Sequence, residues 1–329
     1  MLKIAYIGNR GLHSDNVNGS TRGDGRFCTC AVAGGTQDED MTAYLAYIQK
    51  DHPDAKLYTD YIEMLETEKP DVAVVSPEFY LTATICMECA RRGVHIFAEK
   101  PVAISRGELA ALKKVIQETG VHFMAMHFLR LSGAYYQALC AVRNGEIGEV
   151  RMVNAQKSYK LGQRAAFYKS RKTYGGTIPW VGIHGIDWIY SMIQKPCVKV
   201  SACQSCVGNN GHGELESTCL CQFLFENEVM ASLQIDYLRP MTAADYSDDR
   251  VRVVGTKGTL EVRGKQLYLV NEDGEQTFEP ETGKDLALDF LEEILGGEPC
   301  EITADEIFKI TDLALAAQEA ADSGEIVWL

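Results

Sequence analysis

The chain has 329 residues, which is long for a single hydrophobic core and predicts two domains. Hydrophobic residues make up 46% and charged residues 24%, so a disordered chain is excluded. The 32 basic and 46 acidic residues give a net charge of −14, which disfavours nucleic acid and anionic membranes as partners. No apolar run is long enough to span a bilayer and no signal sequence opens the chain, so we expect a cytoplasmic protein.

The first part of the chain alternates apolar runs that end at glycine or proline with segments of helical spacing. Strands separated by helices pair in parallel, which predicts an N-terminal Rossmann domain, a doubly wound parallel sheet over residues 1–127. The polar, glycine-rich residues 14–26 are interpreted as a loop or a poorly formed first helix. The predicted strands are 3–7, 27–33, 71–76, 94–98 and 121–125, and the predicted helices are 41–49, 61–68, 83–92 and 108–118.

The second part, residues 128–329, has strand-like runs separated by turns rich in glycine, asparagine and aspartate. This pattern predicts an α+β domain with a large, mostly antiparallel sheet, which would bind the substrate. The predicted strands are 150–159, 198–207, 217–225, 229–237, 250–254, 259–262 and 266–270, and the predicted helices are 131–144, 182–193, 285–295 and 304–321.

A glycine turn follows the first strand, where backbone N–H groups can approach a pyrophosphate. The match is imperfect, because Arg10 and His13 stand where glycines are usual, and an ordinary strand-to-loop turn is the alternative. The predicted cofactor-binding residues are Gly8, Asn9, Arg10, Gly11 and Leu12, with Gly35, Thr36, Ser76, Pro77, Tyr80, Glu99 and Lys100 near the ends of later strands.

No acidic residue ends the second strand, where a carboxylate would accept hydrogen bonds from an adenosine ribose. Asp38, Glu39 and Asp40 come later and are interpreted as caps of the next helix. No arginine stands there to favour a 2′-phosphate, so the sequence mildly favours NAD and leaves NADP possible.

Residues 90–101, which end in Ala98-Glu99-Lys100-Pro101, resemble the helix–glycine–strand–Glu-Lys-Pro segment of the Gfo/Idh/MocA family. This family includes glucose–fructose oxidoreductase and inositol dehydrogenase. Residues 144–150, 175–187 and 255–260 are similar to further segments of it, in order along the chain. The resemblance implies an NAD(P)-dependent dehydrogenase acting on CH-OH groups, a homodimer or homotetramer, and a Lys100–Pro101 bond that can be cis.

Three residues are candidates for catalysis. The Lys100 ammonium follows a strand and could stabilise the alkoxide that develops as a hydride leaves; a surface lysine is the alternative. His184 suits a general base because its pKa lies near working pH. Asp187 lies three residues later on a helical stretch and can share a face with His184.

One position departs from the family pattern, which carries an aspartate four residues before the histidine. Here Trp180 stands in that place and cannot accept a proton or carry charge. Either Asp187 or another group orients His184, or the base role has changed. The Trp180 ring could also stack on a sugar ring.

Residues 159–174 are basic and aromatic within an acidic protein. The overall charge disfavours nucleic acid, so we interpret the segment as a substrate-side loop for hydroxyls or a carboxylate, with a solvated loop as the alternative. The predicted substrate-binding residues are Lys100, Arg164, Tyr168, Arg171, Trp180 and His184.

Eleven cysteines invite a metal site, because Cys203-x-x-Cys206 and Cys219-x-Cys221 have zinc-like spacing. On strands, however, Cys203 and Cys206 face opposite sides, so the four cannot converge without a bulge. We therefore predict reduced thiols and no metal.

The predicted function is hydride transfer between a nicotinamide cofactor and a secondary alcohol of a sugar, inositol or glycoside-like substrate. Trp180 keeps two alternatives open. One is an NAD-dependent glycosidase that oxidises, eliminates and reduces with retained NAD. The other is a non-catalytic, cofactor-sensing regulator.

Overall fold

The computed structural model describes residues 1–10 and 13–329. The chain forms two compact units, Met1–Met126 with Asp285–Thr311, and His127–Lys284 with Asp312–Leu329. Residues 285–311 thus group with the first unit, although they follow the sheet of the second. The long helix α10 (Ala304–Ser323) begins among residues of the first unit and ends among residues of the second.

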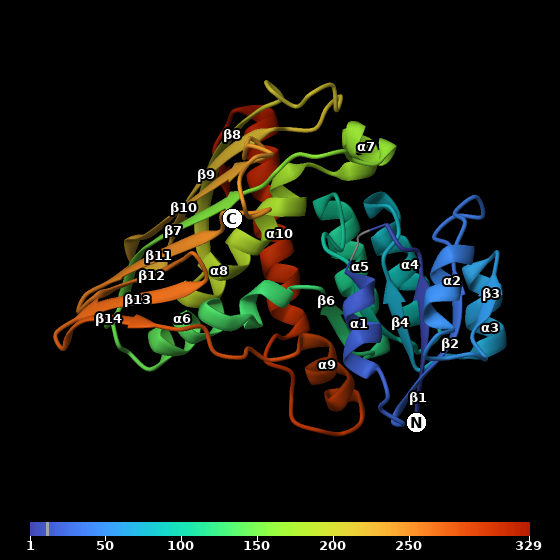
Figure 1. The fold of residues 1–329 in the computed structure, drawn as a ribbon. Coiled ribbons are helices and arrows are strands. Elements are labelled where there is room, and N and C mark those ends of the chain that lie inside the picture. Colours follow the sequence, from blue (N-terminus) through green and yellow to red (C-terminus); the bar gives the residue numbers. More distant parts are fainter. Residues whose placement is uncertain (11–12) are drawn as a thin grey trace. The chain divides into compact units, whose positions relative to one another are not determined.

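The first unit contains a six-stranded parallel sheet of order β3-β2-β1-β4-β5-β6, which confirms the predicted doubly wound fold (Figure 1). Strand β3 was not predicted, because its three residues are partly exposed and carry no apolar run. The strands are β1 (Leu2–Ile7), β2 (Phe27–Ala33), β3 (Lys56–Tyr58), β4 (Val72–Val75), β5 (His95–Ala98) and β6 (Phe123–Ala125). The helices are α1 (Ser14–Thr21), α2 (Thr42–Ile48), α3 (Tyr61–Glu68), α4 (Phe79–Arg91), α5 (Arg106–Thr119) and α9 (Leu286–Ile294).

The central strands of this sheet are apolar along their whole length because both faces are covered. All four residues of β4 are buried, as are Ile4 to Ile7 of β1. The strand order reverses between β1 and β4, and in such sheets ligands bind at the carboxyl ends of the strands where this happens. Of the two alternatives for residues 14–26, the structure has a helix, α1.

The second unit contains a nine-stranded sheet of order β14-β13-β12-β11-β7-β10-β9-β8-β15, which is the predicted large sheet. It is mostly antiparallel, and β10 pairs with β7 in parallel. Strand β14 was not predicted, because its residues are polar and mostly exposed. The strands are β7 (Val150–Ser158), β8 (Cys197–Ser205), β9 (Thr218–Phe225), β10 (Val229–Asp236), β11 (Arg250–Gly255), β12 (Thr259–Arg263), β13 (Gln266–Asn271), β14 (Gly274–Phe278) and β15 (Val327–Trp328).

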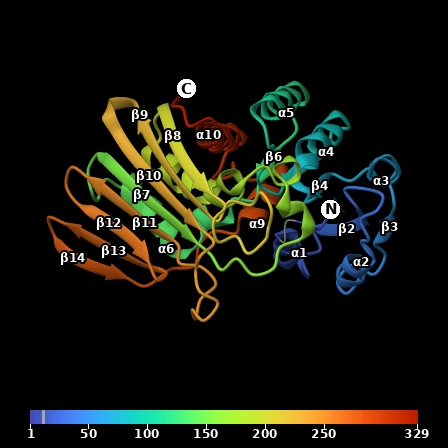
Figure 2. The same ribbon diagram turned by 90° about the horizontal axis from the view of Figure 1, so that it is seen from above.

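Helices cover one face of this sheet, as Figures 1 and 2 show. The buried residues of β7 and β10 alternate along the strands and face α8, as expected for a half-covered sheet. Close approach is possible at Gly185, where a Cβ would lie 2.4 Å from the Leu233 side chain. The helices are α6 (Gly133–Arg143), α7 (Arg171–Tyr174) and α8 (Ile183–Ile193), with a one-turn helix η1 (Phe128–Leu131) and a π-helical turn η3 (Ile178–Gly182) that leads into α8.

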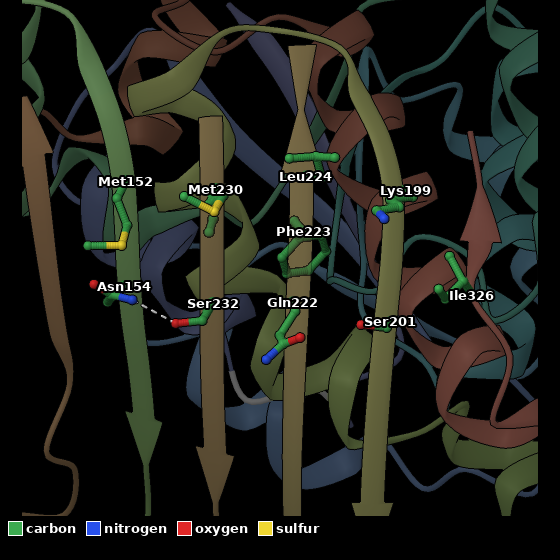
Figure 3. A pocket seen from close by; sticks show the side chains of 11 residues that line it. Met152, Asn154, Lys199, Ser201, Gln222, Phe223, Leu224, Met230, Ser232 and Ile326 are labelled. Atoms are coloured by element: carbon green, nitrogen blue, oxygen red, sulfur yellow. Dashed lines mark hydrogen bonds between the residues drawn. The ribbon is translucent and has the colours of Figure 1, made fainter. Parts of the chain in front are cut away.

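The other face of the sheet carries exposed apolar side chains. Met230 is 54% exposed and lies in a shallow hollow of about 550 Å³ with Met152, Leu224 and Ile326 (Figure 3). Asn154 and Ser232 bridge β7 and β10 on this face through a hydrogen bond of 2.8 Å. In the described part of the chain, no helix is both long enough and apolar enough to cross a membrane.

Candidate functional site

The turn after β1 brings bare backbone to the carboxyl edge of the first sheet. Gly8 has φ +73, and a Cβ there would lie 2.7 Å from the Cα of Pro77 and 2.9 Å from the Ser76 carbonyl oxygen. The Arg10 N–H donates to that same Ser76 oxygen at 2.7 Å. A turn without side-chain bulk at the point where strand order reverses fits a dinucleotide, whose pyrophosphate needs close backbone approach.

The other predicted cofactor residues of the first unit lie around this turn or after it. Gly35 packs against Pro77, since a Cβ on Gly35 would lie 2.5 Å from the Pro77 Cβ. Thr36 is exposed in the loop after β2, and Tyr80 is 37% exposed at the start of α4. Gly11 and Leu12 lie outside the described residues.

Glu39 is the acidic residue that the sequence reasoning assigned to helix capping. Its nearly buried carboxylate instead turns back to the strand ends, where it accepts the N–H of Gly35 at 2.8 Å and of Asn9 at 3.1 Å. The Arg10 Nε lies 3.1 Å from the same carboxylate. A carboxylate thus stands between the ends of β1 and β2, six residues beyond the end of β2. The loop between β2 and Glu39 folds back, so the position of Glu39 along the chain did not indicate that its carboxylate lies at the strand ends.

Glu99 and Lys100 follow β5 at the same edge of the sheet and are almost fully buried. The Glu99 carboxylate accepts the N–H of Lys100 at 3.0 Å and lies 2.8 Å from Nδ1 of His13. The Lys100–Pro101 bond is cis, as the family resemblance implied. Lys100 is therefore buried after the end of β5, and the alternative of an exposed surface lysine is wrong.

In the second unit, Trp180 and His184 lie one turn apart, on η3 and α8. Both are nearly buried, with exposed fractions of 6% and 5%. The Trp180 ring lies 6.0 Å from the ring of Tyr168, centroid to centroid. The π-helical turn at Trp180 is the kind of irregularity that often marks functional sites.

A buried cluster of charged side chains lies beside His184. The Asp187 carboxylate accepts a hydrogen bond from Nε of Arg130 at 3.0 Å, and its Oδ1 also lies 3.4 Å from Nδ1 of His127. The His127 ring in turn lies 6.2 Å from the His184 ring. Burial raises the pKa of the Asp187 carboxyl, but Arg130 and His127 together lower it by more, so the pKa lies below its usual value.

Asp187 therefore bonds to Arg130 and adjoins His127, and its predicted role in orienting His184 stays a prediction. The sequence reasoning did not select His127 or Arg130. Little in the sequence indicated them, because they lie far from residue 184 along the chain and form no recognisable motif with it. Only the packing of η1 against α8 brings them together.

Arg164 lies among tyrosines. Its guanidinium carbon is 5.0 Å from the ring centroid of Tyr237 and 5.9 Å from that of Tyr168. Its Nη2 donates to the Tyr246 hydroxyl at 2.6 Å. Arg171, also predicted to bind substrate, is instead held by Glu216 and by Asp322, the latter at 2.9 Å.

The cysteine pairs lie on and beside neighbouring strands, with Cys203 exposed and Cys219 and Cys221 buried. Burial raises the pKa of the Cys219 and Cys221 thiols, which favours the thiol over the thiolate. Within residues 1–10 and 13–329, no group of three or more metal-ligating side chains comes together.

Two family models match the chain. Residues 35–127 match the NAD-binding Rossmann fold of the Gfo/Idh/MocA oxidoreductase family, and residues 135–261 match the Gfo/Idh/MocA C-terminal domain. A solved structure from Thermotoga maritima, provisionally described as an oxidoreductase, is 42% identical and has a TM-score of 0.95; the match covers 100% of both chains.

Among curated proteins, the chain is 22% identical to 2,7-anhydro-N-acetylneuraminate hydratase of Escherichia coli, over 60% of this chain and 53% of that protein. It is 24% identical to the NAD-dependent scyllo-inositol 2-dehydrogenase of Bacillus subtilis, over 61% of this chain and 57% of that protein. The matched segments thus span little more than half the length of these relatives.

Proposed function

The chain belongs to the Gfo/Idh/MocA family of NAD-binding oxidoreductases, and from this we propose that it oxidises or reduces a secondary alcohol on a sugar- or inositol-like molecule. The observation that carries the proposal is in the first unit. Glu99 and Lys100 follow β5 at the sheet edge where the bare Gly8 turn fits a dinucleotide. The names of the relatives, an inositol dehydrogenase and a neuraminate hydratase, support a polyhydroxylated substrate.

When bound, the nicotinamide would supply the carbon that accepts or donates a hydride. Lys100 would hold the reacting oxygen and stabilise its negative charge as the C–H bond breaks. His184 would take the hydroxyl proton in the oxidising direction and return it in the other. Gly8, Asn9 and Glu39 would hold the dinucleotide.

The family pattern carries an aspartate where Trp180 stands, and several residues together would take over the role of that aspartate. Trp180 cannot orient an imidazole by charge, whereas His127 lies 3.4 Å from the Asp187 carboxylate and its ring lies 6.2 Å from the His184 ring. Arg130 and His127 together offset the effect of burial and lower the pKa of that carboxyl, which keeps it ionised. Asp187 would therefore act on His184 through His127, and Trp180 would offer its ring to the apolar face of a sugar.

NAD is the proposed cofactor in preference to NADP. The Glu39 carboxylate at the end of β2 suits the hydroxyls of an adenosine ribose, and it would repel a 2′-phosphate. Arg10, the nearest cation, is already held by that carboxylate.

The proposal is tested with inositols, hexoses and glycosides incubated with the protein and NAD or NADP, by following the absorbance of the reduced cofactor. We expect reduction of NAD with at least one polyol, and its loss in Lys100→Met and in His184→Asn. If both residues act on one oxygen, the double variant will lose little more than the worse single variant. Bound NAD without turnover across the panel would contradict net dehydrogenation.

A second candidate, oxidation followed by elimination and reduction on retained NAD, is favoured by two observations. Trp180 replaces the aspartate of the dehydrogenases, and the name of the Escherichia coli relative is that of a hydratase, a reaction without net redox change. Co-purified NAD, together with release of an aglycone or addition of water to an anhydro sugar without added cofactor, would identify this chemistry.

We also propose that the uncovered face of the nine-stranded sheet pairs with a second copy, as the family resemblance implies. The hollow around Met230 is mostly apolar, and Lys199 is its one charged lining residue among those described (Figure 3). Met230→Glu should lower the molar mass measured by light scattering. The matched control is Val207→Glu, which changes an apolar residue that is 82% exposed and does not line the hollow.

A further inference from the structure

We propose that Arg164 is the anchor for a carboxylate on the substrate, so that the enzyme acts on sugar acids in preference to neutral sugars. This inference rests on the proposed function, because it assigns the substrate class of the same site. It is carried by the surroundings of one cation within the second unit.

Arg164 is partly buried and has no carboxylate partner among the described residues. Its neighbours are the phenol groups of Tyr168, Tyr237 and Tyr246. Burial lowers the pKa of Arg164, but the tyrosine oxygens raise it by more, so the side chain stays charged. Withdrawal of a cation from water is costly unless an anion compensates it.

The guanidinium also retains unused donors. Nη2 donates to the Tyr246 hydroxyl and, at 3.4 Å, to the Lys160 carbonyl oxygen. Nε is buried and has no hydrogen-bond partner among the described residues. Buried polar groups in native proteins are nearly always satisfied, so the unsatisfied Nε of Arg164 points to an acceptor that arrives from outside.

Two other cations of this unit that are shielded from solvent have carboxylate partners. Arg171, seven residues along the same segment, has Glu216 and Asp322. Lys157 pairs with Asp249 at 2.5 Å. In a chain with 46 acidic and 32 basic residues, carboxylates are the abundant partner, yet the partly buried Arg164 has none among the described residues.

The cluster is connected to the proposed proton-transfer residue within the second unit. Arg164 contacts the Tyr168 ring, the Tyr168 ring lies 6.0 Å from Trp180, and Trp180 precedes His184 by one helical turn. A hollow of about 590 Å³, lined by Leu161, Gln163 and Tyr237 among others, leaves room beside the cluster.

The chemistry favours a carboxylate over a phosphate. One guanidinium supplies a single positive charge and pairs well with a single negative charge. A phosphate monoester carries nearly two charges at neutral pH and calls for further cations or a cluster of backbone donors. The two other nearby cations are already engaged: Lys160 donates to the Ala243 carbonyl, and Arg239, which lines the hollow, donates to the Asp245 carbonyl and lies 3.7 Å from the Asp248 carboxylate.

Calorimetric titration of the full chain with saturating NAD tests this, using glucuronate against glucose, galacturonate against galactose, and glucose 6-phosphate as the phosphate probe. We expect each uronate to bind at least about 10-fold more tightly than its hexose, since a hydrogen bond to a charged group is worth that or more. Arg164→Gln should reduce the ratio to within about 3-fold, and Arg164→Lys should restore part of it. The matched control Arg250→Gln, which loses an exposed ion pair with Asp248, should leave the ratio unchanged.

Equal binding of uronates and hexoses to the wild type overturns the inference, as does tighter binding of the phosphate, and neither result depends on whether a variant folds. Cofactor absorbance separates this failure from failure of the proposed function. Turnover of neutral polyols without any preference for uronates would contradict the role of Arg164 but not the proposed dehydrogenase function. Arg164-dependent uronate binding, with no reduced cofactor from any substrate, would instead contradict the dehydrogenase.

Discussion

Arg130 and Arg164 lie in the same unit and are both shielded from water, Arg130 fully and Arg164 in part, yet their partners differ. Arg130 is 1% exposed and holds the Asp187 carboxylate, with His127 beside it. Arg164 is partly buried among tyrosine rings and has no carboxylate partner among residues 1–10 and 13–329. An arginine that is paired with a buried carboxylate stabilises the fold, whereas an arginine without a carboxylate partner is available to a ligand. Substitutions at the two sites should therefore have different effects on stability and on binding.

The largest effect is expected from Asp187→Asn. It leaves Arg130 buried without its counter-charge, so the free energy of unfolding should fall by about 3–5 kcal/mol. Urea denaturation followed by tryptophan fluorescence measures this change.

The double variant Arg130→Met with Asp187→Leu is the control, because it removes both charges and should cost clearly less than the single variant. The pKa of Asp187 is lowered in the folded state, so its stabilising contribution is present above about pH 3.9 and is lost as pH falls through its folded pKa. A single variant as stable as the wild type would mean that the pair is not closed as described.

His127→Gln should lower kcat by up to about 100-fold with little change in KM, because misplacement of a reacting group is costly. It should also move the pH profile of kcat, which a purely structural residue would not do. His212→Gln, in the loop before β9, is the matched control. An unmoved pH profile would show that Asp187 does not act through His127.

Glu39→Gln extends the comparison to the first unit, where a carboxylate is satisfied by backbone N–H groups and Arg10. We expect NAD to bind about 10-fold more weakly, and the ratio of NADP to NAD affinity to rise, since Arg10 is released for a 2′-phosphate. Titration of both cofactors measures this, with the exposed Asp38→Asn as control. An unchanged ratio would place the ribose away from Glu39.

The smallest effect is expected from Arg164→Met, which should change the free energy of unfolding by less than about 1 kcal/mol. The variant breaks no ion pair, and an apolar chain of similar length can still pack against the tyrosine rings. If the free energy of unfolding fell as much as in Asp187→Asn, Arg164 would have a structural role like that of Arg130.

The sequence by itself determined the features that depend on local order. Apolar runs punctuated by glycine and proline predicted the central strands of both sheets, because a strand buried on one or both faces must be apolar in a regular pattern. The segment at Glu99-Lys100-Pro101 predicted the strand-end lysine and its family. Strands β3 and β14 were not predicted, because exposed edge strands carry no such apolar pattern.

Only the tertiary structure decided which side chains meet. Glu39 returns to the glycine turn through a loop, and His127 and Arg130 reach Asp187 from an element 57 residues or more away. It also separated Arg171, which has carboxylate partners, from Arg164, which has none among the described residues. Such pairings depend on distances across the fold, and residue types along the chain do not specify these distances.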